Sequence, residues 1–112
     1  MSETVLRVVQ MTIEPSRIAE WRAAMRSIAD VSAGETRGLI SITVGVHSEG
    51  VETSGVLASV WSSIEELIAV IGDRWEDAVL PGSIAGMCTR VTVRHFENVG
   101  HWPGPASPPD DQ

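Results

Sequence analysis

The chain has 112 residues and a formal net charge of −7, with 15 acidic and 8 basic residues. Surfaces that bind nucleic acids need clustered cations to meet the phosphates, so this balance argues against a DNA or RNA partner. All basic residues are arginines and tyrosine is missing. Schiff-base chemistry on lysine, a P-loop and a phenolic acid or base are therefore excluded.

The sequence also indicates a compartment. Its one cysteine, Cys88, has no partner in the chain for a disulfide, which is typical of a reducing environment. No run of about 18 apolar residues predicts a transmembrane helix. The N-terminal residues lack a basic region followed by an apolar run, so no signal peptide is expected. We therefore expect a cytoplasmic protein of one small domain without a membrane partner.

The first two elements can be read from periodicity. Residues 4–13, TVLRVVQMTI, are rich in β-branched side chains and predict a strand. A helix is expected next, because Pro15 suits a helix start and Gly34 suits its end. Between Ile18 and Ile28 the apolar residues recur at helical spacing, which predicts one buried stripe.

The middle of the chain predicts a hairpin and a second helix. Residues 38–47 and 56–61 read as strands joined by a polar loop. Residues 62–72 follow as a helix. Ser62 and Ser63 each precede a glutamate by three positions, so a capping box is available in either register.

The last part of the chain predicts a turn, a strand and a tail. Pro81 and Gly82 mark the turn, and residues 87–97 read as the final strand. Residues 98–112, NVGHWPGPASPPDDQ, are rich in proline and predict an extended segment. We therefore expect a folded domain over residues 1–97 and a flexible tail over residues 98–112.

The element order β-α-β-β-α-β predicts the ferredoxin-like split arrangement of the α+β class, a four-stranded antiparallel sheet with two helices on one face. One parity of the hairpin is aliphatic and is expected on the other face. It comprises Ile40, Ile42, Val44, Val46, Val56, Ala58 and Val60. Nothing in the chain is left to cover that face. We therefore expect a homodimer, in which a second sheet covers it to form a dimeric α+β barrel.

The opposite parity of the hairpin is then expected beneath the helices. It carries Thr43 and His47 on the first strand, and Leu57, Ser59 and Trp61 on the second. Small polar side chains cannot fill the layer between sheet and helices. We therefore expect a cavity there, with His47 and Trp61 at its edge.

Alternation also assigns faces on the final strand. His95 shares the parity of Val91 and Val93, so it is expected on the interface side. Arg90 and Arg94 are expected on the opposite side.

Two segments of the chain resemble the antibiotic biosynthesis monooxygenase family of the dimeric α+β barrel superfamily. IEPSRIAEW, residues 13–21, is similar to the strand–proline–helix opening of the family. LASVWSSIEEL, residues 57–67, is similar to its third strand, which ends in Trp-x-Ser before an acidic helix. The resemblance covers roughly residues 4–97 and implies the dimeric barrel fold.

The small quinone-forming monooxygenases of aromatic polyketide pathways resemble the hairpin most. Their histidine on strand two and tryptophan at the end of strand three have the spacing of His47 and Trp61. The resemblance implies that His47 assists proton removal as a general base and that Trp61 bounds the ring plane of the substrate. Leu57 and Leu67 stand where these enzymes have an asparagine and a tyrosine, and their later arginine has no clear counterpart.

The first functional hypothesis is therefore a cofactor-independent monooxygenase acting on a polycyclic aromatic or polyketide-type substrate. By resemblance, the deprotonated substrate itself would supply electrons to oxygen, and Ser59, Thr43 or Gln10 would orient its oxygens. No metal is expected, because three dispersed histidines and one cysteine give no ligand spacing. Cyclisation or isomerisation without oxygen is a variant of this hypothesis.

The second hypothesis is a non-catalytic module that binds a small hydrophobic ligand or serves assembly. The missing asparagine, tyrosine and arginine support it. In this case His47 is a strand-end residue half in solvent. Trp61 is then a core residue that closes the junction of helix and sheet.

Overall fold

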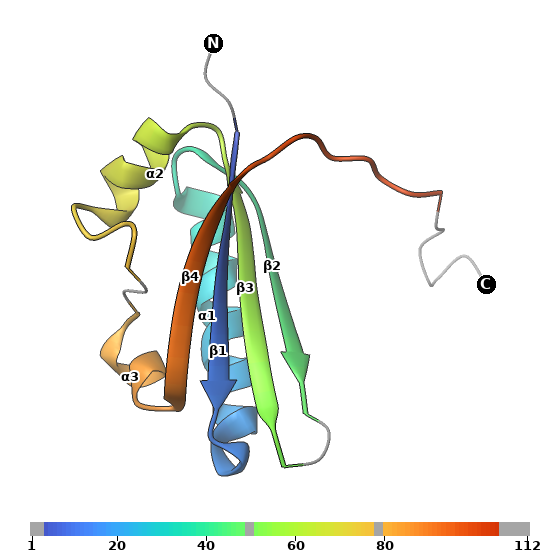
Figure 1. The fold of residues 1–112 in the computed structure, drawn as a ribbon, viewed down its shortest axis with the longest axis vertical. Helices are drawn as coiled ribbons and strands as arrows, with labels where there is room; N and C mark the ends of the chain where they lie inside the picture. Colours follow the sequence, from blue (N-terminus) through green and yellow to red (C-terminus); the bar gives the residue numbers. More distant parts are fainter. Residues whose placement is uncertain (1–3, 49–50, 78–79, 106–112) are drawn as a thin grey trace.

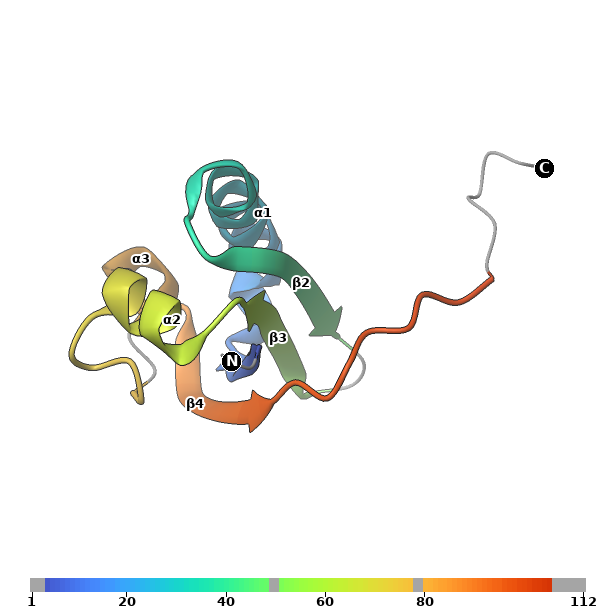
Figure 2. The same cartoon turned by 90° about the horizontal axis from the view of Figure 1, so that it is seen from above.

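The computed structural model describes residues 4–48, 51–77 and 80–105. They form a four-stranded antiparallel sheet with the helices against one of its faces (Figures 1 and 2). The elements in chain order are β1 (Val5–Ile13), η1 (Pro15–Arg17), α1 (Ile18–Glu35), β2 (Leu39–His47), β3 (Thr53–Trp61), α2 (Ile64–Ile71), α3 (Gly82–Ala85) and β4 (Cys88–Glu97). The predicted β-α-β-β-α-β order is confirmed, with the short helices η1 and α3 added to it.

The strands lie in the order β2-β3-β1-β4, so β1 and β3 are central and β2 and β4 form the edges. The long helix α1 lies along the sheet, and α2 and α3 lie beside it toward β4 (Figure 2). Within the described ranges, no helix is long and apolar enough to cross a bilayer.

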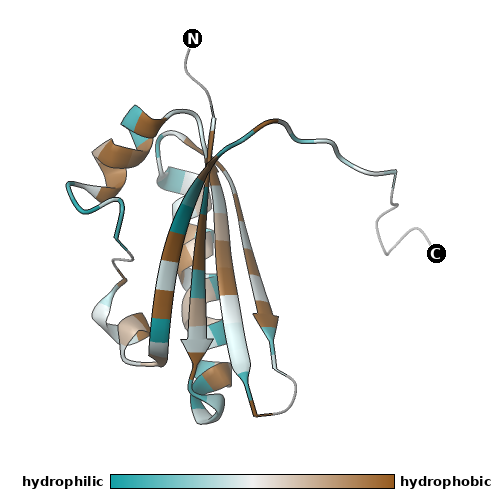
Figure 3. Ribbon diagram, viewed as in Figure 1, coloured by the Kyte–Doolittle hydropathy of each residue, from teal (hydrophilic) through white to brown (hydrophobic). Residues whose placement is uncertain are grey.

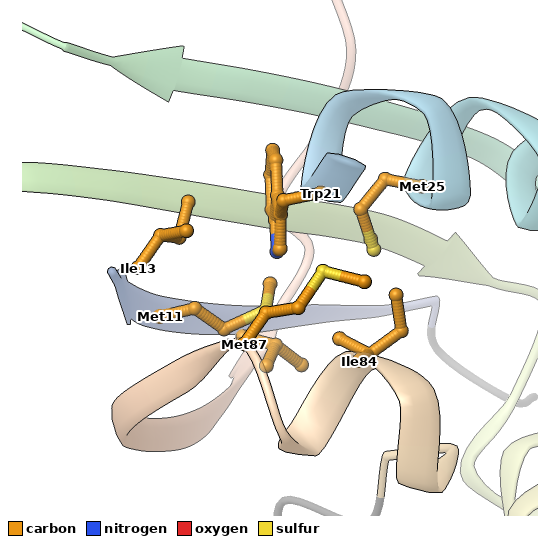
Figure 4. Close-up of a cluster of buried hydrophobic side chains, with 7 residues drawn as sticks. Met11, Ile13, Trp21, Met25, Ile84 and Met87 are labelled. Atoms are coloured by element: carbon orange, nitrogen blue, oxygen red, sulfur yellow. The ribbon is translucent and has the colours of Figure 1, made fainter. Parts of the chain in front are cut away.

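The hydrophobic core lies between β1 and the helices. Along β1, buried side chains alternate with more exposed ones, as expected for a strand with one covered face. Met11 and Ile13 point into the same layer as Trp21 and Met25 of α1 (Figure 4), and Val9 belongs to the same core cluster. The α3 region closes the layer from the side. Trp21 is fully buried, and burial of a large apolar side chain contributes about 1.5–3 kcal/mol to stability.

A glycine in β3 lets α1 approach the sheet closely. A Cβ atom at Gly55 would overlap the indole ring of Trp21 and stand 3.0 Å from Cδ1 of Ile13. The indole ring of Trp21 therefore packs directly against the backbone of Gly55.

The sequence offers two candidate N-cap residues for helix α2, Ser62 and Ser63, and the structure distinguishes them. Ser63 is the N-cap residue, and its Oγ accepts a hydrogen bond from the backbone N–H of Glu66 at 3.1 Å. The helix ends at Gly72, whose φ of 100° lies in the region that favours glycine. This short helix is therefore fixed at both ends.

The predicted assignment of faces in the hairpin is wrong on β2. His47 pairs with Ser54 and Val44 pairs with Leu57, so opposite parities of the two strands share a face. Alternation within each strand does not determine the register between the two strands. A shift of one residue at the turn moves every side chain of one strand to the other face of the sheet. The pairing of β2 with β3 has one irregularity, at Ile40, which is an extra residue between the paired Leu39 and Ser41.

As a result, the helices cover the aliphatic side of β2. Val44 and Val46 pack against the hydrophobic core. On β3 the prediction holds, and Val56, Ala58 and Val60 lie on the face opposite the helices. Apolar and polar positions alternate along the strands (Figure 3).

The face opposite the helices, called the open face below, carries a half-buried apolar patch on the two central strands. The patch consists of Leu6, Val8, Val56, Ala58 and Val60. At the edges, Arg94 pairs with Val8 and Thr43 pairs with Ala58, whereas exposed Phe96 pairs with Leu6, so the flank is polar in part and extends the apolar surface onto β4.

The chain leaves the sheet after β4. The backbone N–H of Asn98 donates to the carbonyl oxygen of Thr4 at 2.9 Å, which holds the root of the segment. Beyond it Val99 is 86% and Trp102 is 78% exposed. The described part of this segment runs away from the sheet (Figure 1), and residues 106–112 of the predicted tail lie outside the described residues.

Candidate functional site

A cavity of about 180 Å³ lies between the sheet and the helices. Its walls come from α1, α2, the segment leading into α3, and the helix-facing sides of β1, β2 and β3. Most of its lining is aliphatic. The prediction of a cavity in this layer is confirmed, but its lining differs from the predicted one.

Two predicted site residues form one wall of the cavity. Trp61 and Ser59 lie two positions apart on β3, so both side chains point toward the helices. The indole Nε1–H of Trp61 donates to Oγ of Ser59 at 3.0 Å. This bond fixes the ring, and it leaves the hydroxyl proton of Ser59 for another acceptor. Leu57, two positions before Ser59 on β3, lines the same wall.

The charged residue of the cavity comes from β1. Arg7 is the one charged side chain in the described lining, and it is 5% exposed. Burial lowers the pKa of its guanidinium from the usual value, but an arginine remains protonated at neutral pH. A cation therefore stands in a mostly apolar cavity.

The guanidinium of Arg7 is held by neutral acceptors. Nη1 donates to the carbonyl oxygen of Trp75 at 2.5 Å, and Nη2 donates to the carbonyl oxygen of Asp77 at 3.4 Å. Nη1 also lies 2.9 Å from Nε2 of His95. Among the described residues, no carboxylate forms an ion pair with Arg7. The carboxylate of Asp77 pairs with Arg74 instead, at 3.2 Å.

His95 of β4 is neutral in this arrangement. A guanidinium can only donate, so Nε2 of His95 must accept and its proton must lie on Nδ1. Burial and the charge of Arg7 lower the pKa of His95, and Glu76 acts in the opposite sense. The ring packs edge-on against Trp75 with the ring centroids 4.9 Å apart. His95 thus positions Arg7 from the side of β4.

The predicted site residues of β2 and β1 do not reach the cavity. His47 and Thr43 lie on the open face, because their β3 partners Ser54 and Ala58 do. Gln10 also lies there, opposite Val56. The prediction that His47 shares a face with Trp61 is therefore wrong, for the register reason given above. Gln10 and His47 line a separate hollow on the open face.

Arg7 and His95 were missed as site residues, although the sequence carried a signal for both. Arg7 has the parity of Val9 and Met11, so a charge interrupts the apolar side of a central strand. Alternation groups His95 with Val91 and Val93, and the structure keeps that grouping. The prediction that this parity lies at the interface is wrong, since Val91 and Val93 pack against the core beneath the helices.

Two other chemistries find little support around the cavity. In the parts of the chain that the structure describes, no three His, Cys, Asp or Glu residues are grouped to hold a metal ion. The single thiol, Cys88, is half-buried, and burial raises its pKa, which disfavours the thiolate that a nucleophile needs.

Comparison with solved structures places the fold. A Caulobacter crescentus protein provisionally named an antibiotic biosynthesis monooxygenase superimposes with a TM-score of 0.70 at 12% identity, over 88% of this chain and 92% of that one. SnoaB of Streptomyces nogalater, a cofactor-independent oxygenase, gives a TM-score of 0.66 at 17% identity, over 92% of this chain and 100% of that one. A Nitrosomonas europaea protein, also provisionally named an antibiotic biosynthesis monooxygenase, gives 0.68 at 10% identity, over 88% and 93%.

No protein-family model and no curated protein matches the sequence. The resemblance to the antibiotic biosynthesis monooxygenases is confirmed at the level of the fold, since the four-stranded α+β arrangement is shared. At these identities the likeness concerns architecture. The chemistry has to be argued from the cavity itself.

Proposed function

We propose that this protein is a cofactor-independent oxygenase that binds a phenolic aromatic substrate of the polyketide type in the cavity between sheet and helices. One observation carries the proposal: an apolar cavity has an immobilised indole wall, Trp61, beside the hydroxyl of Ser59 and the cation of Arg7. A flat ring packs well on an indole, and the two polar groups suit a ring oxygen. The oxygenase activity named for SnoaB, on the same fold, supports the reaction class.

The reaction balances without a cofactor. A phenol and O₂ give a quinone and water: one oxygen atom replaces hydrogen at a ring carbon and the other leaves as H₂O. The four electrons that reduce O₂ come from the substrate. The protein would contribute by binding the ring, by stabilising its deprotonated oxygen and by excluding water.

The test uses 1-naphthol and the full-length protein after treatment with a chelator. We expect oxygen uptake that matches the 1,4-naphthoquinone formed, one to one. Ile28→Trp, which places a large ring in the cavity, should abolish the uptake. Thr43→Val, on the open face, is the matched control and should retain it. Uptake that survives in Ile28→Trp would contradict the proposal, as would its absence for every phenol that binds.

A second candidate function is ligand binding without turnover. Among the described lining residues, none is a carboxylate or a histidine, so no general base stands ready beside a bound ring. The role of His47 as a base stays a prediction from the resemblance, and the same uptake assay on His47→Ala tests it. Calorimetric binding of 1-naphthol without oxygen uptake would favour the binding module. Isomerisation or cyclisation would instead show as a product formed without oxygen.

We also propose that two copies associate through the open face. The apolar patch of β1 and β3 is half-exposed in the single chain, although central strands are normally covered. A second copy would bury it if the same patch of both subunits came together across a twofold axis. The cavity lies on the other side of the sheet, so each subunit would keep its own site.

A further inference from the structure

Arg7 is an unusual residue for its position. It is the third residue of the central strand β1 and lies on the covered side, where its neighbours are half-buried Val5 and buried Val9. Moving a charged side chain out of water is costly unless the charge is compensated. The positive charge of Arg7 therefore needs a compensating negative group. That group is either part of the protein or part of a ligand bound in the cavity.

The described residues compensate this charge only in part. The acceptors of Arg7 are two backbone carbonyl groups and one neutral imidazole, with no carboxylate among them. A guanidinium has five N–H donors, and these contacts use three of them. The Nε–H and one Nη2–H have no acceptor among the described residues. A ligand oxygen within reach of the guanidinium would accept from them.

The cavity sets the size of that ligand. A cavity of about 150 Å³ in another protein takes up benzene, so the present volume of about 180 Å³ suits one ring or two fused rings. Apart from Arg7, the polar side chains of the lining are Ser32, Thr36 and Ser59. A ligand here would be largely apolar with polar atoms at few points.

We propose that the cavity takes a mono- or bicyclic aromatic ligand with an anionic oxygen, a phenolate, enolate or carboxylate, and that Arg7 binds this oxygen. The inference rests on the proposed use of the cavity as a ligand site and names the chemical class of its occupant. Bidentate pairing with a planar carboxylate, or a single bond with a phenolate, suits the guanidinium fork. The oxygen would supply the negative charge that the protein does not.

The first experiment compares two ligands of nearly equal shape, 1-naphthoate and neutral 1-naphthamide, by calorimetry at pH 7.5 under anaerobic conditions. Wild type should bind the carboxylate about 10- to 100-fold more tightly, the range expected for hydrogen bonds to a charged group. Equal affinities, or no binding of either compound, would overturn the proposal.

Variants assign the preference to Arg7. Arg7→Met has a similar length without the charge, and it should lose the preference while still binding the amide. Arg94→Gln, an exposed arginine of the neighbouring strand on the open face, is the matched control and should keep the preference. A preference that survives in Arg7→Met would overturn the assignment.

A further measurement does not depend on how a variant folds. 2-Naphthol bound to the wild type should ionise at lower pH than free 2-naphthol, by about one pH unit or more, seen in its absorbance spectrum. An apolar cavity without an effective cation would shift the ionisation to higher pH, and that result would refute the role of Arg7. All three readouts are binding measurements without oxygen. The role of Arg7 in binding is therefore tested independently of the proposed oxygenase activity, and either proposal can be refuted while the other holds.

Discussion

Gly55 and Trp21 form a contact in which each residue limits the other. A methyl group at position 55 would overlap the indole ring, which is fully buried and has little room to move. Gly55→Ala should therefore lower the free energy of unfolding by about 1–3 kcal/mol, the usual cost of overpacking. Urea denaturation measures this change.

Gly34 provides the control for that substitution. It lies near the end of α1, is exposed, and has no atom within 4 Å of an added Cβ. Gly34→Ala should be neutral or stabilising by up to about 1 kcal/mol, because alanine favours the helix. Equal effects of the two substitutions would mean that the Trp21 ring shifts freely.

His95 should make the stability depend on pH. Its pKa in the folded protein lies below the ordinary value of 6.5, because burial and Arg7 disfavour the imidazolium. The unfolded chain therefore takes up a proton first on acidification, and stability falls as the pH drops below about 6.5. The loss continues until the pH passes the folded pKa. Urea midpoints between pH 7.5 and pH 5 should show this slope.

The matched variant for this prediction is His95→Gln. It keeps a side chain that accepts from Arg7 and has no titration in that range. The slope between pH 6.5 and pH 5 should be reduced relative to wild type. An unchanged slope would assign the acid sensitivity to other groups.

At the level of elements, the start of α2 depends on one hydroxyl. Ser63 caps the helix, so Ser63→Ala should destabilise the protein by about 1 kcal/mol. Ser62→Ala, one position earlier, also removes a serine hydroxyl but leaves the cap of Ser63 intact. It should change stability by less than about 0.5 kcal/mol. Thermal denaturation of both variants distinguishes the two registers. The reverse ranking would contradict the observed cap.

The elements themselves were predictable because their periods are local. The stripe of α1, the β-branched run of β1 and the serine–glutamate spacing of α2 each arise within a few residues. The pairing of β2 with β3 was not predictable in the same way. It depends on the turn and on the extra residue Ile40, and a slip of one position changes every side chain's face.

The candidate site shows the same division. Trp61 and Ser59 were predicted because both lie on one strand, where alternation is reliable. His47 was misplaced because its position relative to Trp61 depends on a register between strands. Arg7 required knowledge of which parity of β1 the helices cover, and the partners of its guanidinium come from segments about 70 and 90 residues away.

At the scale of the whole molecule, the open face predicts the oligomeric state. Stable interfaces bury about 1,000 Å² or more, and apolar area contributes about 25 cal/mol per Å². Wild type should therefore scatter light with twice the mass of the chain at micromolar concentration. Ala58→Glu, in the centre of the apolar patch, should give a monomer. Ala23→Glu, an exposed alanine of α1, should remain a dimer. A monomeric wild type would contradict the proposed association.

The four tryptophans lie at very different depths, and no tyrosine accompanies them. Trp21 is completely buried, Trp61 is 5% exposed beside the cavity, and Trp102 is 78% exposed beyond β4. The near-ultraviolet emission of the protein is therefore a sum of distinguishable reporters. Iodide should quench exposed Trp102 most strongly and half-buried Trp75 less, and a ring entering the cavity should change the emission of Trp61. The molecule thus carries built-in optical probes for its tail, its core and its cavity, and none of them requires a label.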